Sequence, residues 1–138
     1  MSAEPLTVAL SCVIPGVPER ALNPNSRPYP LAKAHATREL RQLTAWVARQ
    51  HRPAVSLSGK VRLRYVVCWP RGHKRLDWTN VVGSLKAVED GLVDAGWLVD
   101  DAQVIGADVE QRLWSEQDAG TRATYPQGAV TVIVEPAS

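Results

Sequence analysis

Between Lys60 and Trp69 the chain alternates apolar and polar side chains with a period of two. A helix has a period of 3.6 residues, so this stretch fits a β-strand with one buried and one solvated face. The apolar face would hold Val61, Leu63, Tyr65, Val67 and Trp69, and the polar face Lys60, Arg62 and Arg64. Because such a face must be buried against another layer, the segment predicts a layered fold containing a sheet.

Five other segments supply the remaining layers. We predict three further strands, at residues 6–14, 103–114 and 129–135. We also predict two helices, one at about residues 34–51 and one that begins at residue 80 or 84 and ends at residue 95, before Gly96. The helices carry apolar stripes, Ala36, Leu40, Leu43 and Val47 in the first and Val81, Leu85, Val88 and Leu92 in the second. The order β-α-β-α-β-β predicts an α/β or mixed α+β fold, with a small mixed sheet of about four strands and two main helices. We expect residues 1–138 to form a single domain.

The cysteines give no sign of a disulfide or zinc framework. Cys12 and Cys68 lie in apolar runs without CxxC or Cys/His spacing, and we interpret both as reduced core residues. Trp46 and Trp69 are expected in the core. The early apolar run 8–13 lacks a basic leader and is too short to cross a bilayer. We therefore expect a soluble, cytoplasmic protein with no membrane partner.

The formal net charge of +2 hides a strong asymmetry along the chain. Residues 33–75 hold eleven Lys or Arg and one acid, whereas residues 76–118 hold ten Asp or Glu and two bases. Such a distribution predicts a surface for a polyanion set beside an acidic surface that attracts metal ions. A basic helix face, strand face and loop follow one another and indicate contact with a phosphate backbone.

Carboxylates flank the second predicted helix at both ends. Asp77 precedes it, and Asp100 and Asp101 follow it. Hard oxygen ligands of this kind hold Mg²⁺, which can activate a bound water and neutralise charge on a phosphate. Lys86, inside the helix, is suited to stabilise transition-state charge or to protonate a leaving oxygen. Taken alone, the same residues also fit a helix cap, a turn and an exposed lysine.

Three linked segments resemble the RusA family of Holliday-junction resolvases. They are Asp77-Trp78-Thr79-Asn80 after the basic loop, Lys86 in the following helix, and Ala95-Gly96-Trp97-Leu98-Val99-Asp100-Asp101-Ala102-Gln103-Val104. The resemblance covers about residues 70–105. It implies an endodeoxyribonuclease, dependent on Mg²⁺ with Mn²⁺ as an alternative, that resolves four-way DNA junctions in recombination or repair. Family members are dimers, so it also implies a homodimer.

The resemblance implies a role for each matching residue. Metal binding falls to Asp77, Asp100 and Asp101, catalysis to Asp77, Lys86 and Asp101, and DNA binding to Arg38, Arg41, Arg71, Lys74, Arg75 and Asn80. Thr79 stands where the family has a second carboxylate, and the Asn80–Lys86 spacing is about three residues longer than in the family. An alternative is therefore a catalytically weakened protein that binds junction DNA. A third reading, a metal phosphohydrolase acting on nucleotides, leaves the basic tract unexplained.

The length of the second helix constrains how its flanking carboxylates can meet. A helix of twelve to sixteen residues is roughly 18–24 Å long, so Asp77 and Asp101 would flank opposite ends. Within one chain they meet only if residues 71–79 double back along the helix. Otherwise the site is completed across a dimer, and a two-fold dimer also suits a substrate cut on two strands of like polarity.

Overall fold

The computed structural model describes residues 10–18, 30–53 and 55–137, and for residues 78–80 the backbone alone. Four strands form one sheet in the order β1-β4-β2-β3, namely β1 (Leu10–Pro15), β4 (Ala129–Pro136), β2 (Val61–Cys68) and β3 (Val104–Arg112). β4 runs antiparallel to both β1 and β2, whereas β2 and β3 are parallel. The predicted mixed sheet of four strands is therefore confirmed.

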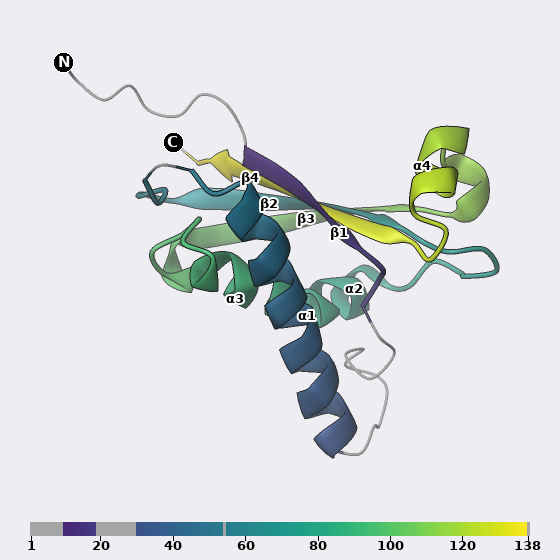
Figure 1. The fold of residues 1–138 in the computed structure, drawn as a ribbon, viewed down its shortest axis with the longest axis horizontal. Helices are drawn as coiled ribbons and strands as arrows, with labels where there is room; N and C mark the ends of the chain where they lie inside the picture. Colours follow the sequence, from purple (N-terminus) through teal and green to yellow (C-terminus); the bar gives the residue numbers. More distant parts are fainter. Residues whose placement is uncertain (1–9, 19–29, 54, 138) are drawn as a thin grey trace.

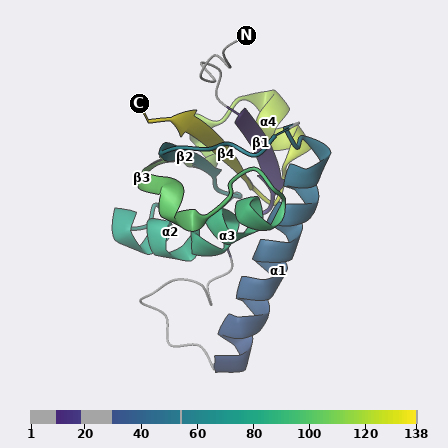
Figure 2. The same ribbon diagram turned by 90° about the vertical axis from the view of Figure 1, so that its left-hand side faces the viewer.

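Three helices cover one face of this sheet (Figure 1). They are α1 (Pro30–Gln50), α2 (Trp78–Ser84) and α3 (Lys86–Asp94). Figure 2 shows them on the same side when the molecule is turned by 90°. The second predicted helix is in fact two helices, because the backbone leaves helical geometry at Leu85 (φ −97°, ψ 2°). As expected, the positive φ of Gly96 follows the end of α3.

The polar segment before β4 is more structured than its composition indicates. It contains a 3₁₀ turn, η3 (Trp114–Glu116), and a short helix, α4 (Ala119–Thr124). The Asp118 side chain caps α4 by accepting a hydrogen bond from the Thr121 amide at 2.6 Å. α4 lies beyond the end of the sheet where β2 and β3 finish (Figure 1). Another 3₁₀ turn, η2 (Asp101–Gln103), leads into β3.

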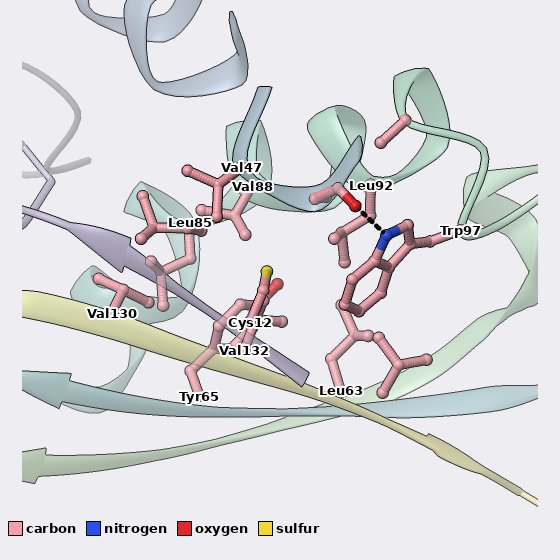
Figure 3. Packing of buried hydrophobic residues seen from close by; sticks show 14 of the residues in the cluster. Cys12, Val47, Leu63, Tyr65, Leu85, Val88, Leu92, Trp97, Val130 and Val132 are labelled. Atoms are coloured by element: carbon pink, nitrogen blue, oxygen red, sulfur yellow. Dashed lines mark hydrogen bonds between the residues drawn. The ribbon is translucent and has the colours of Figure 1, made fainter. Parts of the chain in front are cut away.

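The core lies between the sheet and α3. The inward residues of β2 and the apolar stripe of α2 and α3 are each 2% exposed or less, as the two sequence patterns predict, namely Val61, Leu63, Tyr65, Val67, Val81, Leu85, Val88 and Leu92. Figure 3 shows several of these side chains meeting between the layers. Each fully buried side chain of this size contributes about 1.5–3 kcal/mol relative to an exposed one, so this contact stabilises the fold.

The tryptophans divide between core and surface differently from the prediction. Trp69 is buried as expected. Trp97 is also buried, and its indole N–H donates to the carbonyl of Ala48 at 2.7 Å (Figure 3). The prediction for Trp46 is wrong, since its side chain is 63% exposed. The inner face of α1 at this level is formed by small residues, Thr44, Ala45 and Ala48, which leaves the neighbouring tryptophan outside.

Helices α1 and α3 approach each other very closely. A Cβ atom added to Gly91 would lie 2.6 Å from Thr44 Cβ and 2.8 Å from the carbonyl oxygen of Arg41. On the same pair of helices, the Arg41 guanidinium donates two hydrogen bonds to the Asp94 carboxylate, at 2.6 and 2.9 Å. Glycine is therefore required at position 91 for this packing, and the Arg41–Asp94 ion pair links the two helices at the edge of the contact.

Both cysteines occupy the core, as predicted. Cys12 and Cys68 are buried free thiols, and burial raises the pKa of Cys12 to about 11. A thiol of this kind is a poor nucleophile. Within the described residues, no helix combines the length and the apolar character needed to cross a membrane.

Candidate functional site

Lys86 sits among three carboxylates at the start of α3. Its Nζ lies 2.5 Å from Glu89 Oε2, 3.2 Å from Asp101 Oδ2 and 3.6 Å from Asp90 Oδ1. Glu89 and Asp90 belong to the same helix, whereas Asp101 comes from η2. With all four groups ionised, the cluster has a net charge of −2, so it combines a fixed cation with an excess of oxygen donors.

A hydrogen-bonded turn holds Asp101 in place. Asp100 Oδ1 accepts from the Ala102 amide at 3.0 Å, and the Gln103 side chain accepts from the Asp100 amide at 3.0 Å. The Gln103 amide group also donates to the carbonyl oxygen of Leu57 at 2.9 Å. This capping box fixes the turn from both sides. Asp100 therefore shapes the backbone, while Asp101 points to Lys86.

The same contacts shift the pKa values of the central pair. The hydrogen bond to Glu89, followed by the one to Asp101, raises the pKa of Lys86 well above its ordinary range. A hydrogen bond with Asp100, followed by the contact with Lys86, lowers the pKa of Asp101. Both groups are therefore charged at neutral pH, with the ammonium held especially firmly in its protonated form.

Asp77 is not among the carboxylates within 4.0 Å of Lys86. It is the N-cap residue of α2, but its exposed carboxylate makes no capping hydrogen bond. The preceding residue, Leu76, is tied through its amide and carbonyl to the Gln111 side chain at 2.9 and 2.8 Å. Gln111 is near the end of β3, whereas Asp101 precedes its start. A strand rises about 3.3 Å per residue, so β3 spans roughly 23 Å between Val104 and Gln111.

The residues predicted to bind metal are thus only partly brought together. The structure places Asp101 beside Lys86, uses Asp100 to cap the turn that holds Asp101, and leaves Asp77 at the other end of β3. No three His, Cys, Asp or Glu side chains of the described chain are grouped ready to hold an ion. The oxygen donors around Lys86 are nevertheless of the hard type that Mg²⁺ prefers, with room for water as the other ligands.

A cavity of about 250 Å³ opens next to this cluster. Its walls come from the first turns of α1 and from the junction of α2 and α3, and they include Lys33, Thr37, Gly83, Ser84, Lys86, Ala87 and Asp90. Lys86 and Asp90 therefore face both the carboxylate cluster and an open space. A ligand in this cavity would meet the cation directly.

Two of the arginines predicted to bind DNA are engaged within the protein. Arg41 pairs with Asp94, and Arg75 pairs with Glu116 and donates to the Gln111 carbonyl at 2.6 Å. The remaining exposed cations predicted for this role, Arg38, Arg71 and Lys74, have no carboxylate within ion-pair distance in the part of the chain that the structure describes. The side chain of Asn80, also predicted to bind DNA, and residues 19–29 lie outside the part that the structure describes.

The basic segments do not form one continuous surface. The helices cover the face of the sheet that holds the inward residues of β2, such as Leu63 and Tyr65. Arg62 and Arg64 are on the opposite, exposed face, where Arg64 pairs with Glu135 at 3.2 Å. Consecutive basic segments in the sequence are therefore divided between two sides of the molecule.

Sequence reasoning gave no role to Glu89 or Gln111. Glu89 could have been found, because residues three apart on a helix are neighbours and Lys86 is three residues before it. Gln111 gave no such signal. It is a polar residue in a strand, and its contacts are with Trp69 and Leu76, 42 and 35 residues away.

Comparison with known proteins adds no relative. No protein-family model matches the chain, and no curated protein is significantly similar to it. The resemblance over residues 70–105 stays a prediction. The case for a function therefore depends on the geometry around Lys86 and Asp101.

Proposed function

We propose that this protein is a metal-dependent endodeoxyribonuclease that cuts four-way DNA junctions. The observation that carries the proposal is the 3.2 Å contact between Lys86 Nζ and Asp101 Oδ2. It joins two of the segments that resemble the resolvases, on an exposed rim with further carboxylates. A fixed cation beside oxygen ligands is an arrangement suited to phosphodiester hydrolysis.

Asp101 would be the principal metal ligand, supported by Asp100 and Asp90. Bound there, Mg²⁺ or Mn²⁺ would supply an activated water and neutralise charge on the scissile phosphate. Lys86 would face the phosphate oxygens from the cavity side. Because its pKa is raised, it is a poor proton donor at neutral pH. We therefore assign it to stabilising transition-state charge, rather than to protonating the leaving oxygen.

Asp77 would join the site from a second copy of the chain. Its carboxylate is exposed and makes no capping hydrogen bond. The preceding Leu76 is anchored to Gln111 near the end of β3, whereas Asp101 precedes the start of that strand. A homodimer would supply the missing ligand and two active sites for two strands of a junction. Full activity in a species that light scattering shows to be monomeric would contradict this part of the proposal.

The first test compares a labelled four-way junction with a matching linear duplex, each in EDTA, Mg²⁺ and Mn²⁺. We expect paired nicks in the junction only when a metal is present, and none with Asp101→Asn. Asp108→Asn is the matched control, because Asp108 is an exposed carboxylate of β3 outside the cluster. Equal activity of the Asp101 variant, or neither binding nor cutting by the natural protein, would refute the proposal.

A second candidate is a protein that binds junctions and cuts them poorly or not at all. Two observations favour it, namely Thr79 in place of a family carboxylate and the distance of Asp77 from the Lys86 cluster. It predicts tight junction binding without nicks, and a gain of cutting in Thr79→Asp. Metal-dependent nicking by the natural protein would exclude it.

A further inference from the structure

Two arginines from different segments lie over the ring of one tryptophan. Trp114 lies in η3 just after β3, Arg71 in the loop that follows β2, and Arg122 in α4. The Cζ atoms of Arg71 and Arg122 lie 5.4 and 6.0 Å from the centroid of the Trp114 ring. All three segments come together at the end of the sheet where β2 and β3 finish (Figure 1).

The charges of these two arginines are not neutralised by ion pairs. Neighbouring cations are paired, Arg75 with Glu116 and Arg112 with Glu110. Among the residues described, neither Arg71 nor Arg122 has a carboxylate within 4.0 Å. Asp118 is the acid that lies in the field of Arg122, and its carboxylate caps α4 through the Thr121 amide.

Contacts with the end of the sheet hold the loop that carries Arg71 in place. His73 stacks on Trp69 with ring centroids 4.0 Å apart and nearly parallel planes. The indole N–H of Trp69 in turn donates to Gln111 at 2.9 Å, and the same Gln111 side chain holds Leu76. Arg71 is therefore presented from a fixed loop, and Lys74 adds an exposed cation next to it.

A guanidinium lying over an aromatic ring keeps its in-plane N–H groups available. Those groups form a rigid fork that matches the oxygens of a phosphate, and stacking limits the side-chain entropy lost when the hydrogen bonds form. Two such forks on one ring, without carboxylate partners, are suited to a chain of phosphates more than to a single carboxylate.

We infer that Arg71 and Arg122, which lie over the Trp114 ring, form a clamp for the phosphodiester backbone of DNA. This inference depends on the proposed function for its ligand, but not on cleavage. It adds α4 and η3, for which the sequence analysis predicted no function, to the proposed DNA-binding surface. It also replaces Arg75, which is held by Glu116. The clamp is at the Asp77 end of β3, away from the Lys86 cluster.

The test measures binding in EDTA, so that cleavage plays no part. The probes are a four-way junction, a 20-base-pair duplex and single-stranded dT₂₀, each over a range of salt concentrations. The logarithm of the binding constant falls as the logarithm of the salt concentration rises. Each lost phosphate contact makes this negative slope shallower by about 0.9 on duplex DNA and about 0.7 on single strands. We expect Arg71→Ala and Arg122→Ala each to make the slope shallower by about that much and to weaken binding about three- to tenfold.

Matched variants separate a clamp from general attraction. Arg112→Ala removes the same charge at the end of β3, but this arginine is already paired with Glu110, so the substitution should change neither quantity. Arg122→Lys keeps the charge and loses the fork, so it should weaken binding. Trp114→Leu should weaken binding without any change in charge, provided that its thermal unfolding remains cooperative. If Trp114→Leu unfolds, Arg122→Lys still decides the question.

The outcomes distinguish this inference from the nuclease proposal. Weaker binding in the clamp variants, with no cutting by the natural protein, would support the clamp and refute the nuclease. Normal binding in these variants beside metal-dependent cutting would do the reverse. An equal loss in Arg112→Ala would overturn the clamp in favour of diffuse charge, and so would competition by polyglutamate as strong as that by DNA.

Discussion

Lys86 Nζ lies 3.2 Å from Asp101 Oδ2, although one residue begins α3 and the other follows its end. On the proposed mechanism, Lys86→Met removes the charge and keeps most of the side-chain length. We expect the single-turnover cleavage rate to fall about 10²–10³-fold, as when one stabilising group is removed from a transition state. Junction affinity in EDTA should change less than about twofold, because Glu89 and Asp101 already pair with the Lys86 ammonium. An unchanged cleavage rate would contradict the assignment.

The pKa of Asp101 provides a separate test that needs no activity. Hydrogen bonding with Asp100 and then the contact with Lys86 lower this pKa. Lys86→Met should therefore raise the pKa of Asp101 toward its ordinary value, with the Asp100 contribution remaining. Carboxyl ¹³C titration by NMR measures the change. No shift would mean that the two groups do not interact in solution.

The Arg41–Asp94 pair predicts how stability depends on pH. Hydrogen bonds from Arg41 lower the pKa of Asp94 in the folded protein. Its contribution is therefore present above the unfolded carboxyl pKa of about 3.9 and is lost as pH falls through the lower folded value. We expect Asp94→Asn to lower the free energy of unfolding by about 0.5–1 kcal/mol at pH 7, as for a partly exposed pair. Urea unfolding should show this difference shrinking below pH 4.

Gly91 provides a test of the contact between α1 and α3. Alanine usually stabilises a helix by about 1 kcal/mol relative to glycine. Here the new Cβ would overlap Thr44 Cβ, so Gly91→Ala should instead destabilise the protein by about 1–3 kcal/mol. Gly120→Ala in α4 is the control, because its Cβ would lie 3.4 Å from Asp118 Oδ1, an ordinary contact. A stabilising Gly91→Ala would show that the helices are further apart.

The Gln111 side chain links the sheet to the loop before α2. Its amide bonds to Trp69 and to both backbone groups of Leu76. Gln111→Leu leaves these groups unpaired, so we expect a loss of about 1–3 kcal/mol and faster hydrogen exchange at the Leu76 amide. Exchange at Val134 in β4 serves as the internal reference. Equal acceleration at both amides would indicate global destabilisation, not local release.

Much of the fold could be predicted because it follows from local periodicity. The alternation in β2 and the stripe through Val81 and Leu92 depend only on which face is buried, and both are confirmed. The break at Leu85 and the burial of Trp97 could not be predicted. They depend on which distant groups are nearby, such as the Ala48 carbonyl that accepts the Trp97 indole N–H.

The candidate site could be predicted only in part for the same reason. Sequence order placed Lys86 and Asp101 in adjacent elements, but their contact depends on how η2 returns beside α3. The sequence order could not indicate that Arg41 pairs with Asp94 and Arg75 with Glu116, because those partners lie 53 and 41 residues away in the chain. The charge pattern of a sequence shows how many cations there are. It does not show which of them remain exposed without an acidic partner.

The Gln103 side chain bonds the turn that holds Asp101 to the segment at Leu57 and Gly59. Its amide joins regions more than forty residues apart in sequence, so the turn becomes rigid only when the whole domain has folded. The conformational entropy of Asp101 is then lost during folding and is not lost again when a ligand arrives. A substitution at Gln103 would therefore weaken ligand binding at a carboxylate that it does not touch, by restoring that freedom to the unbound state.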